Sequence, residues 1–322
     1  METKEQLLAH MDPELRPFYE MMPEYSMTPY DTLMVIRHGA EVMRQQVPVS
    51  PIDRDDLIFR KEQILPEDLE VRVYEPVARK KVSTAILYFH GGGCVLGTAE
   101  QDDAAAVSLA LEYNTVVFNV NYRCAPEFPA PAGQLDAVRT WKWLLAEGME
   151  KYSINTSKVV FYGGSGGANI AIGAALRILD EGEKLPAGLV VPYPMIDDRG
   201  ITVSSQMDMD TSLWGRGHNQ AAWNYLLHGL DTMDTAEADA YIAPARRTDL
   251  RGLPPVLTFV GSVDILRDET IAFVQHLAES DVDVEFSLYP GAFHGFDVYV
   301  PEAGCAKRAA EAVRLFLQKR FA

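Results

Sequence analysis

The sequence has few cysteines, few positive charges and no long hydrophobic runs. Its 322 residues include three cysteines, Cys94, Cys124 and Cys305, and this odd, sparse set excludes a disulfide framework and favours a reducing compartment. Lysine and arginine number 29 against 46 acidic residues, which gives a formal net charge of −17. A surface this acidic repels phosphate backbones and anionic lipids, so neither nucleic acid nor a membrane surface is expected as a partner.

Two further absences concern location and cofactors. The first residues contain early acids without the apolar stretch of a signal peptide, and no apolar run approaches the roughly 18 residues of a membrane helix. The sequence contains no His-Glu-x-x-His motif and no cysteine–histidine spacing typical of a metal site. It therefore predicts a soluble, cytoplasmic protein that uses no metal or other cofactor.

Strand-like and helix-like segments alternate over most of the chain. Runs rich in valine, isoleucine and phenylalanine predict strands at 84–90, 115–122, 158–164, 188–194, 255–261 and 283–291. Helical patterns separate these runs at 104–112, 134–147, 168–180, 268–279 and 306–321. This alternation predicts an α/β fold with a mainly parallel sheet that helices cover on both sides. Residues 68–76 alternate more clearly in polarity and are expected to begin the sheet as an antiparallel edge strand.

Two segments do not follow this alternation. The first, residues 1–50, contains a helical pattern, and the second, residues 195–254, is too long for an ordinary crossover and predicts a mostly helical insertion. Eleven of the 12 methionines fall in these two segments. Because methionine packs adaptably, we expect the two segments to form one two-piece helical cap. The α/β core would then comprise residues 51–194 and 255–322.

A glycine-rich stretch contains the candidate nucleophile. Gly163-Gly164-Ser165-Gly166-Gly167 fits the pattern G-x-S-x-G and lies between a predicted strand and a predicted helix. That context is typical of a nucleophile elbow, a sharp turn that exposes a serine hydroxyl. Residues 163 and 167 are expected to be small because the strand and the helix pass close to each other there. Ser165 is thus the candidate nucleophile.

A serine nucleophile also needs amide donors for an oxyanion, a base and an acid. Donors are available at residues 90–93, where three glycines follow a strand, and at Gly166, directly after the serine. Four histidines follow Ser165, and His294 is the one in the loop past the last predicted strand. The candidate acid is Asp264, one strand earlier, and its rival is Asp268 at the start of the next helix.

Five segments together carry a family resemblance. HGGGCVLGTAEQDD, VNYRCAPEFPAPAGQLDAV, GGSGGANIAIGAAL, VDILRDE and HGF resemble, in order over residues 87–297, the hormone-sensitive-lipase-like branch of the α/β-hydrolases. That family comprises carboxylesterases of the α/β-hydrolase fold with a two-piece helical cap and a preference for short acyl chains. The resemblance implies a serine carboxylesterase whose triad is Ser165, Asp264 and His294 and whose oxyanion donors are Gly92, Gly93 and Gly166.

The resemblance has further implications outside the triad. It implies that Arg123 and Glu127, in the segment YRCAPE, brace the loops under the site. Relatives often dimerise through a sheet edge, which raises a homodimer as a partner besides the small-molecule ester. Trp214, Trp223 and Tyr225 in the insertion are candidates either for lining an acyl or alcohol pocket or for the core of the cap.

One feature departs from the family pattern. The family usually has GDSAG around the serine, whereas this chain has glycine at both Gly164 and Gly166. Each added glycine costs roughly 0.5–1 kcal/mol of conformational stability, so the elbow is expected to be more flexible. Two alternative functions are compatible with the same residues. One is a receptor-like homologue that binds a small molecule with little catalysis, and the other is an amidase or lactonase with the same triad.

Overall fold

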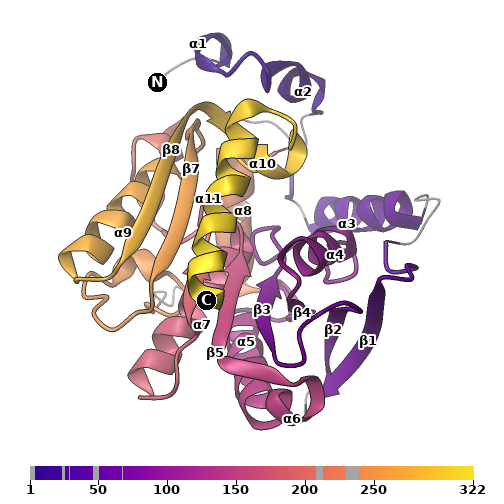
Figure 1. Cartoon of the computed structure of the whole chain (residues 1–322). Helices are drawn as coiled ribbons and strands as arrows, with labels where there is room; N and C mark the ends of the chain where they lie inside the picture. The colour runs from indigo at the N-terminus through magenta and orange to yellow at the C-terminus, as the bar shows by residue number, and fades with distance from the viewer. Residues whose placement is uncertain are drawn as a thin grey trace.

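The computed structural model describes residues 4–23, 26–28, 30–45, 51–66, 68–207, 213–229 and 239–322. Its centre is an eight-stranded sheet in the order β1-β2-β4-β3-β5-β6-β7-β8 (Figure 1). Strands β3 to β8 are parallel, whereas β2 pairs antiparallel with both β1 and β4. The strands are β1 (Leu57–Ile64), β2 (Leu69–Pro76), β3 (Ser83–Phe89), β4 (Val116–Val120), β5 (Ile154–Gly163), β6 (Gly188–Val190), β7 (Val256–Val263) and β8 (Val284–Phe293).

The sheet confirms the predicted parallel strands and corrects the predicted edge. Strand β2 is antiparallel as expected, but β1 covers its outer side, with Leu57 opposite Pro76 and Ile64 opposite Leu69. The prediction that residues 68–76 form the edge is therefore wrong. Strand β1 was not predicted because Arg60, Lys61 and Glu62 interrupt its apolar pattern. Such charged residues are typical of an edge strand that is exposed to water.

Helices pack on the sheet as the alternation predicts. Helix α4 lies against β2 and β4, α7 against β3 and β5, and α9 against β7 and β8. Helix α11 crosses in front of the central strands in Figure 1 and contacts β5, β7 and β8. No helix in the described ranges is long and apolar enough to span a bilayer. The helices of this core are α4 (Asp103–Tyr113), α5 (Ala132–Trp143), α6 (Met149–Tyr152), α7 (Gly166–Asp180), α9 (Arg267–Glu279), α10 (Phe296–Tyr299) and α11 (Gly304–Phe321).

The N-terminal segment contributes α1 (Lys4–His10), α2 (Arg16–Met21) and α3 (Tyr30–Gln45). It touches the inserted segment where the Tyr225 hydroxyl, on α8 (Arg216–His228), donates a hydrogen bond of 3.1 Å to the Met27 carbonyl. Of the described residues between 195 and 254, only α8 and two single 3₁₀ turns are helical. The described part of the insertion is therefore less helical than predicted. Met1, Met209 and Met233 lie outside the described residues.

Candidate active site

Ser165 lies in the sharp turn between β5 and α7. Its backbone has φ 58° and ψ −119°, a conformation that residues other than glycine rarely adopt. A Cβ atom at Gly163 would lie 2.5 Å from the Gly167 carbonyl oxygen, and one at Gly167 would lie 2.1 Å from the Phe89 carbonyl oxygen. Strand and helix approach so closely that only glycine fits at positions 163 and 167.

Ser165, His294 and Asp264 meet at the carboxyl edge of the parallel strands. The Oγ atom of Ser165 lies 2.9 Å from Nε2 of His294, and Nδ1 of His294 lies 2.9 Å from Oδ2 of Asp264. His294 follows β8 directly, and Asp264 follows β7 directly. All three residues are buried, and the most exposed of them, His294, is 8% exposed. The arrangement allows one imidazole to accept the serine proton while the carboxylate orients it.

The rival residues are engaged elsewhere. Asp268, on the first turn of α9, accepts the backbone N–H of Ser204 over 2.7 Å and so holds the inserted segment. His276 lies 3.4 Å from Glu279 on the same helix. His218 accepts the N–H of Gly215 at the start of α8. Among these candidates, the structure brings only Asp264 and His294 to the serine.

The glycine loop after β3 lies against the start of α7. Gly92 and Gly93 have φ of 103° and 62°, so the loop needs residues without a Cβ atom. A Cβ atom at Gly166 would lie 2.6 Å from the Gly93 nitrogen. Within the described ranges, no oxygen accepts a hydrogen bond from the amides of Gly92, Gly93 or Gly166. Three unpaired N–H donors therefore lie beside Ser165.

His90 supports this loop and is not placed as a base. Its ring stacks on Tyr122 with centroids 4.2 Å apart, and the Tyr122 hydroxyl donates to the His90 carbonyl over 2.8 Å. Its Nδ1 atom lies 2.9 Å from the Gly91 carbonyl oxygen. Burial lowers the pKa of His90, which keeps the imidazole neutral.

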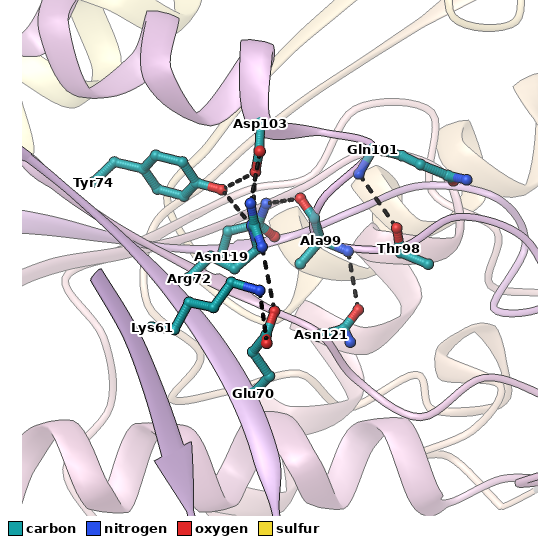
Figure 2. A network of polar contacts seen from close by, with 10 residues as sticks. All are labelled: Lys61, Glu70, Arg72, Tyr74, Thr98, Ala99, Gln101, Asp103, Asn119 and Asn121. Carbon is teal, nitrogen blue, oxygen red and sulfur yellow. Dashed lines mark hydrogen bonds and ion pairs between the residues drawn. The ribbon is translucent and has the colours of Figure 1, made fainter. Parts of the chain in front are cut away.

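A buried polar network anchors the segment that follows the glycine loop (Figure 2). Arg72 on β2 donates to both carboxylate oxygens of Asp103 over 2.8 and 2.7 Å, and the Tyr74 hydroxyl also donates to Asp103. Just upstream of Asp103, two asparagines hold the backbone of Ala99: Asn119 donates to the Ala99 carbonyl, and the Ala99 N–H donates to Asn121. Because these partners lie on the sheet or directly after a strand, the segment that follows the glycine loop is fixed to a rigid support.

Arg37 on α3 braces the same loop from the other side, and the sequence did not reveal it. Its guanidinium donates to the carbonyls of Val95 over 2.9 Å and Ala125 over 2.6 Å, and to Glu127 over 2.7 Å. Partial burial opposes ionisation of Glu127, but hydrogen bonds from Arg37 and Tyr30 hold its pKa below the ordinary value. Glu127 thus braces the site through Arg37.

The other residue that the resemblance singles out, Arg123, also has a partner of its own. Its guanidinium donates to the fully buried carboxylate of Asp136, with Nη2 2.8 Å from Oδ1. Asp136 also accepts the backbone N–H of Arg123 over 3.0 Å. This ion pair fixes the chain that follows β4 to helix α5.

A cavity of about 1020 Å³ opens onto Ser165 and His294. Trp214, from the inserted segment, forms part of its wall. Its indole packs so closely on the glycine loop that a Cβ atom at Gly93 would lie 2.2 Å from it. The ring centroids of Trp214 and His294 lie 6.1 Å apart. The pocket-lining alternative therefore holds for Trp214. Trp223 is buried away from the cavity and Tyr225 bonds to Met27, so for these two residues the packing alternative holds. Within the described part of the chain, no group of three or more histidine, cysteine or acidic side chains is placed to hold a metal ion.

Sequence comparisons extend over most of the chain. The family described as alpha/beta hydrolase fold matches residues 86–298. The carboxylesterase NlhH of Mycobacterium tuberculosis is 31% identical over 245 residues, which cover 76% of this chain and 75% of that protein. The FAD-linked oxidoreductase pytB of Aspergillus terreus is 29% identical over 81% of this chain, but the chain spans 32% of that protein's length.

Two solved structures match nearly the whole chain. A bacterial heroin esterase has a TM-score of 0.86 and 30% identity, with 98% of this chain and 99% of that chain covered. An esterase from the bacterial hormone-sensitive lipase family has a TM-score of 0.81 and 25% identity, with 97% and 99% covered. These similarities confirm the expected fold and ester-hydrolase activity. The chain therefore belongs to the α/β-hydrolase fold family, in its hormone-sensitive-lipase-like carboxylesterase branch.

Proposed function

We propose that this carboxylesterase hydrolyses short-chain acyl esters with Ser165 as nucleophile, His294 as general base and acid, and Asp264 as the residue that orients His294. The observation that carries the proposal is the unbroken pair of 2.9 Å contacts from Ser165 Oγ to His294 and from His294 to Asp264. Both distances suit the proton transfer that activates a serine.

The proposed reaction has two halves. The Ser165 oxygen attacks the ester carbonyl carbon as His294 Nε2 takes its proton, and the amides of Gly92, Gly93 and Gly166 donate to the carbonyl oxygen as it becomes negative. The carbon–oxygen bond to the alcohol then breaks, and His294 returns the proton to the departing alkoxide. Water attacks the acyl-serine with His294 again as base, and the carboxylic acid leaves as the serine recovers its proton.

The walls of the cavity support a preference for small acyl groups. Trp214 closes the cavity over Gly93, and Arg37 and Ile36 on α3 border it from the N-terminal segment. We propose that residues 1–50 and 195–254 together act as the cap that limits chain length. We also place the enzyme in the cytoplasm because Cys94, Cys124 and Cys305 are unpaired thiols. Cell fractionation tests this location.

Labelling with an organophosphonate tests the triad. Mass spectrometry should find one phosphonyl adduct on Ser165, and Ser165→Ala should remove it. Ser108→Ala is the matched control because Ser108 lines the same cavity from α4, and among the described residues the hydroxyl that contacts His294 Nε2 is that of Ser165. Labelling that survives Ser165→Ala would overturn the assignment of the nucleophile.

A panel of p-nitrophenyl acetate, butyrate and octanoate with a matching anilide tests the substrate class. We expect the rate to fall from butyrate to octanoate and to be lowest on the anilide. A faster rate on the anilide would favour the amidase alternative. Stoichiometric labelling without turnover of any ester would favour the receptor-like alternative.

A further inference from the structure

Two neighbouring aspartates at the start of α4 have different surroundings. Asp103 is buried and binds the Arg72 guanidinium through two hydrogen bonds (Figure 2). Asp102 is half-buried, lines the active-site cavity and accepts a hydrogen bond of 2.9 Å from the Tyr88 hydroxyl. The other ionisable groups whose charges act together with that of Asp102 are His90, Asp103, Tyr122 and Tyr299. No lysine or arginine in the described ranges forms an ion pair with Asp102. The protein thus leaves the charge of Asp102 without a cation.

A second aspartate lines the same cavity three residues after His294. Asp297 is half-buried on α10, and its Oδ1 atom is buried without any hydrogen-bond partner. The Tyr193 hydroxyl and His294 stabilise its charged form, but within the described residues no lysine or arginine pairs with it. A buried carboxylate oxygen without a hydrogen-bond partner makes the negative charge costly, and a positive charge nearby would offset that cost.

Tyrosine rings line the same cavity as these two carboxylates. Tyr88 and Tyr162 lie with ring centroids 5.7 Å apart, and Tyr193 lies 4.8 Å from the His294 ring. Burial raises the pKa of Tyr88, and the charges of both Asp102 and Asp297 raise it further. Tyr88 therefore lies within the field of both carboxylates. Aromatic faces and carboxylates together are the surroundings that stabilise an ammonium ion.

The cations that line the cavity cannot serve these aspartates. Arg37 pairs with Glu127, and Arg123 pairs with the fully buried Asp136. The carboxylates of Asp102, Glu112 and Asp297 also lie on the cavity wall, and within the described residues none of these three forms an ion pair. A substrate that brought its own positive charge would correct this imbalance.

We propose that Asp102, Asp297 and the tyrosines around them form a subsite for a positively charged nitrogen, so that the enzyme prefers esters bearing a protonated or quaternary amine. This inference rests on the proposed function, because the subsite shares one cavity with Ser165. It names a substrate class that the triad alone does not define. An ammonium group here would pair with Asp102 and Asp297 out of bulk water and pack against Tyr88 and Tyr162.

Isosteric ester pairs test the subsite. Choline butyrate and 3,3-dimethylbutyl butyrate have the same shape, and the charge of the first lies in its alcohol part. Betaine ethyl ester and ethyl 3,3-dimethylbutanoate carry the same difference in the acyl part. In at least one pair we expect kcat/KM to favour the cationic ester by about tenfold or more. Asp297→Asn and Asp102→Asn should each lower that ratio, because each removes one carboxylate from the subsite.

Glu150→Gln is the matched control. Glu150 is exposed on α6, so its neutralisation changes the net charge equally without touching the cavity, and it should leave both ratios unchanged. Two aspartates on different elements keep the test open if one variant fails to fold. The subsite would be overturned if the ratio of kcat/KM for the cationic ester to that for the neutral ester were the same in the wild type and in both Asp→Asn variants, for both ester pairs. If p-nitrophenyl butyrate is still hydrolysed, the proposed esterase mechanism stands, whereas loss of that activity would count against the mechanism itself.

Discussion

Asp264 binds His294 with one carboxylate oxygen and the backbone of its own loop with the other. Oδ2 lies 2.9 Å from His294 Nδ1, and Oδ1 accepts the N–H of Leu266 over 2.9 Å. Because both oxygens are engaged, the carboxylate has one orientation. It therefore selects the tautomer of His294 that carries its proton on Nδ1 and leaves Nε2 free to accept the proton of Ser165.

Replacing Asp264 by asparagine should lower kcat by about 10³–10⁴-fold while the fold stays intact, because an amide no longer selects this tautomer. Steady-state kinetics and circular dichroism measure the two effects. Asp268→Asn is the control, since Asp268 serves Ser204 and not His294. Equal losses of kcat in the two variants would contradict the role of Asp264.

A methyl group at Gly166 should displace the glycine loop after β3. Its carbon would lie 2.6 Å from the Gly93 nitrogen, so the loop must shift. Because loss of one oxyanion donor costs about 10²–10³ in kcat, we expect Gly166→Ala to reduce kcat by about tenfold or more. The matched variant Gly164→Ala meets a Tyr193 ring carbon at 3.0 Å, a side chain that can move, and should retain most activity. Full activity of Gly166→Ala would show that the loop yields without cost.

Trp214 should set the acyl-chain preference. Trp214→Leu opens the cavity wall above Gly93, so the ratio of kcat/KM for p-nitrophenyl octanoate to that for the acetate should rise severalfold. Trp223→Phe serves as control because Trp223 is buried outside the cavity. An unchanged ratio in Trp214→Leu would mean that another wall limits chain length.

Asp297 should make the fold less stable as the pH rises. Burial raises its pKa to about 6, against roughly 3.9 for a free aspartate, so the folded protein holds this proton more tightly than the unfolded chain does. The stabilising contribution of the bound proton is complete below about pH 4 and is lost as the pH passes 6, by up to about 3 kcal/mol. The groups whose charges act together with Asp297 are His294, Tyr193, Tyr88, Tyr162 and Tyr289.

Asp297→Asn removes this ionisation. The free energy of unfolding of the variant relative to that of the wild type should therefore be higher at pH 7.5 than at pH 4.5. Urea unfolding at the two pH values measures the difference in the free energy of unfolding. A difference that does not change with pH would show that Asp297 ionises as freely as an exposed aspartate.

The sequence predicted the residues that lie close to a strand end and missed those defined by distant partners. Ser165 and His294 could be placed because each lies in a loop directly after a predicted strand. Asp264 was found although β7 continues to Val263, beyond the expected end of the strand. Arg37 gave no signal, because its partners lie 58 to 90 residues away and no local pattern marks such a contact.

The same limit applies to the cavity wall and to the inserted segment. Asp102 and Asp103 are adjacent acids in the sequence, and only the fold shows that one faces Arg72 and the other Tyr88. The insertion was expected to be mostly helical from its length, but length alone does not specify helix. Its described residues are held by side-chain contacts such as that between Asp268 and Ser204.

The contact between Ser165 and His294 joins positions 129 residues apart. Most of the sheet, the elbow and the glycine loop are already synthesised when the ribosome reaches β8. Under the proposed mechanism, they lack their general base until the imidazole that follows this strand is in place. A nascent or prematurely terminated chain should thus be inert toward cellular esters. We expect hydrolysis to begin only after the last strand has left the ribosome and joined the sheet.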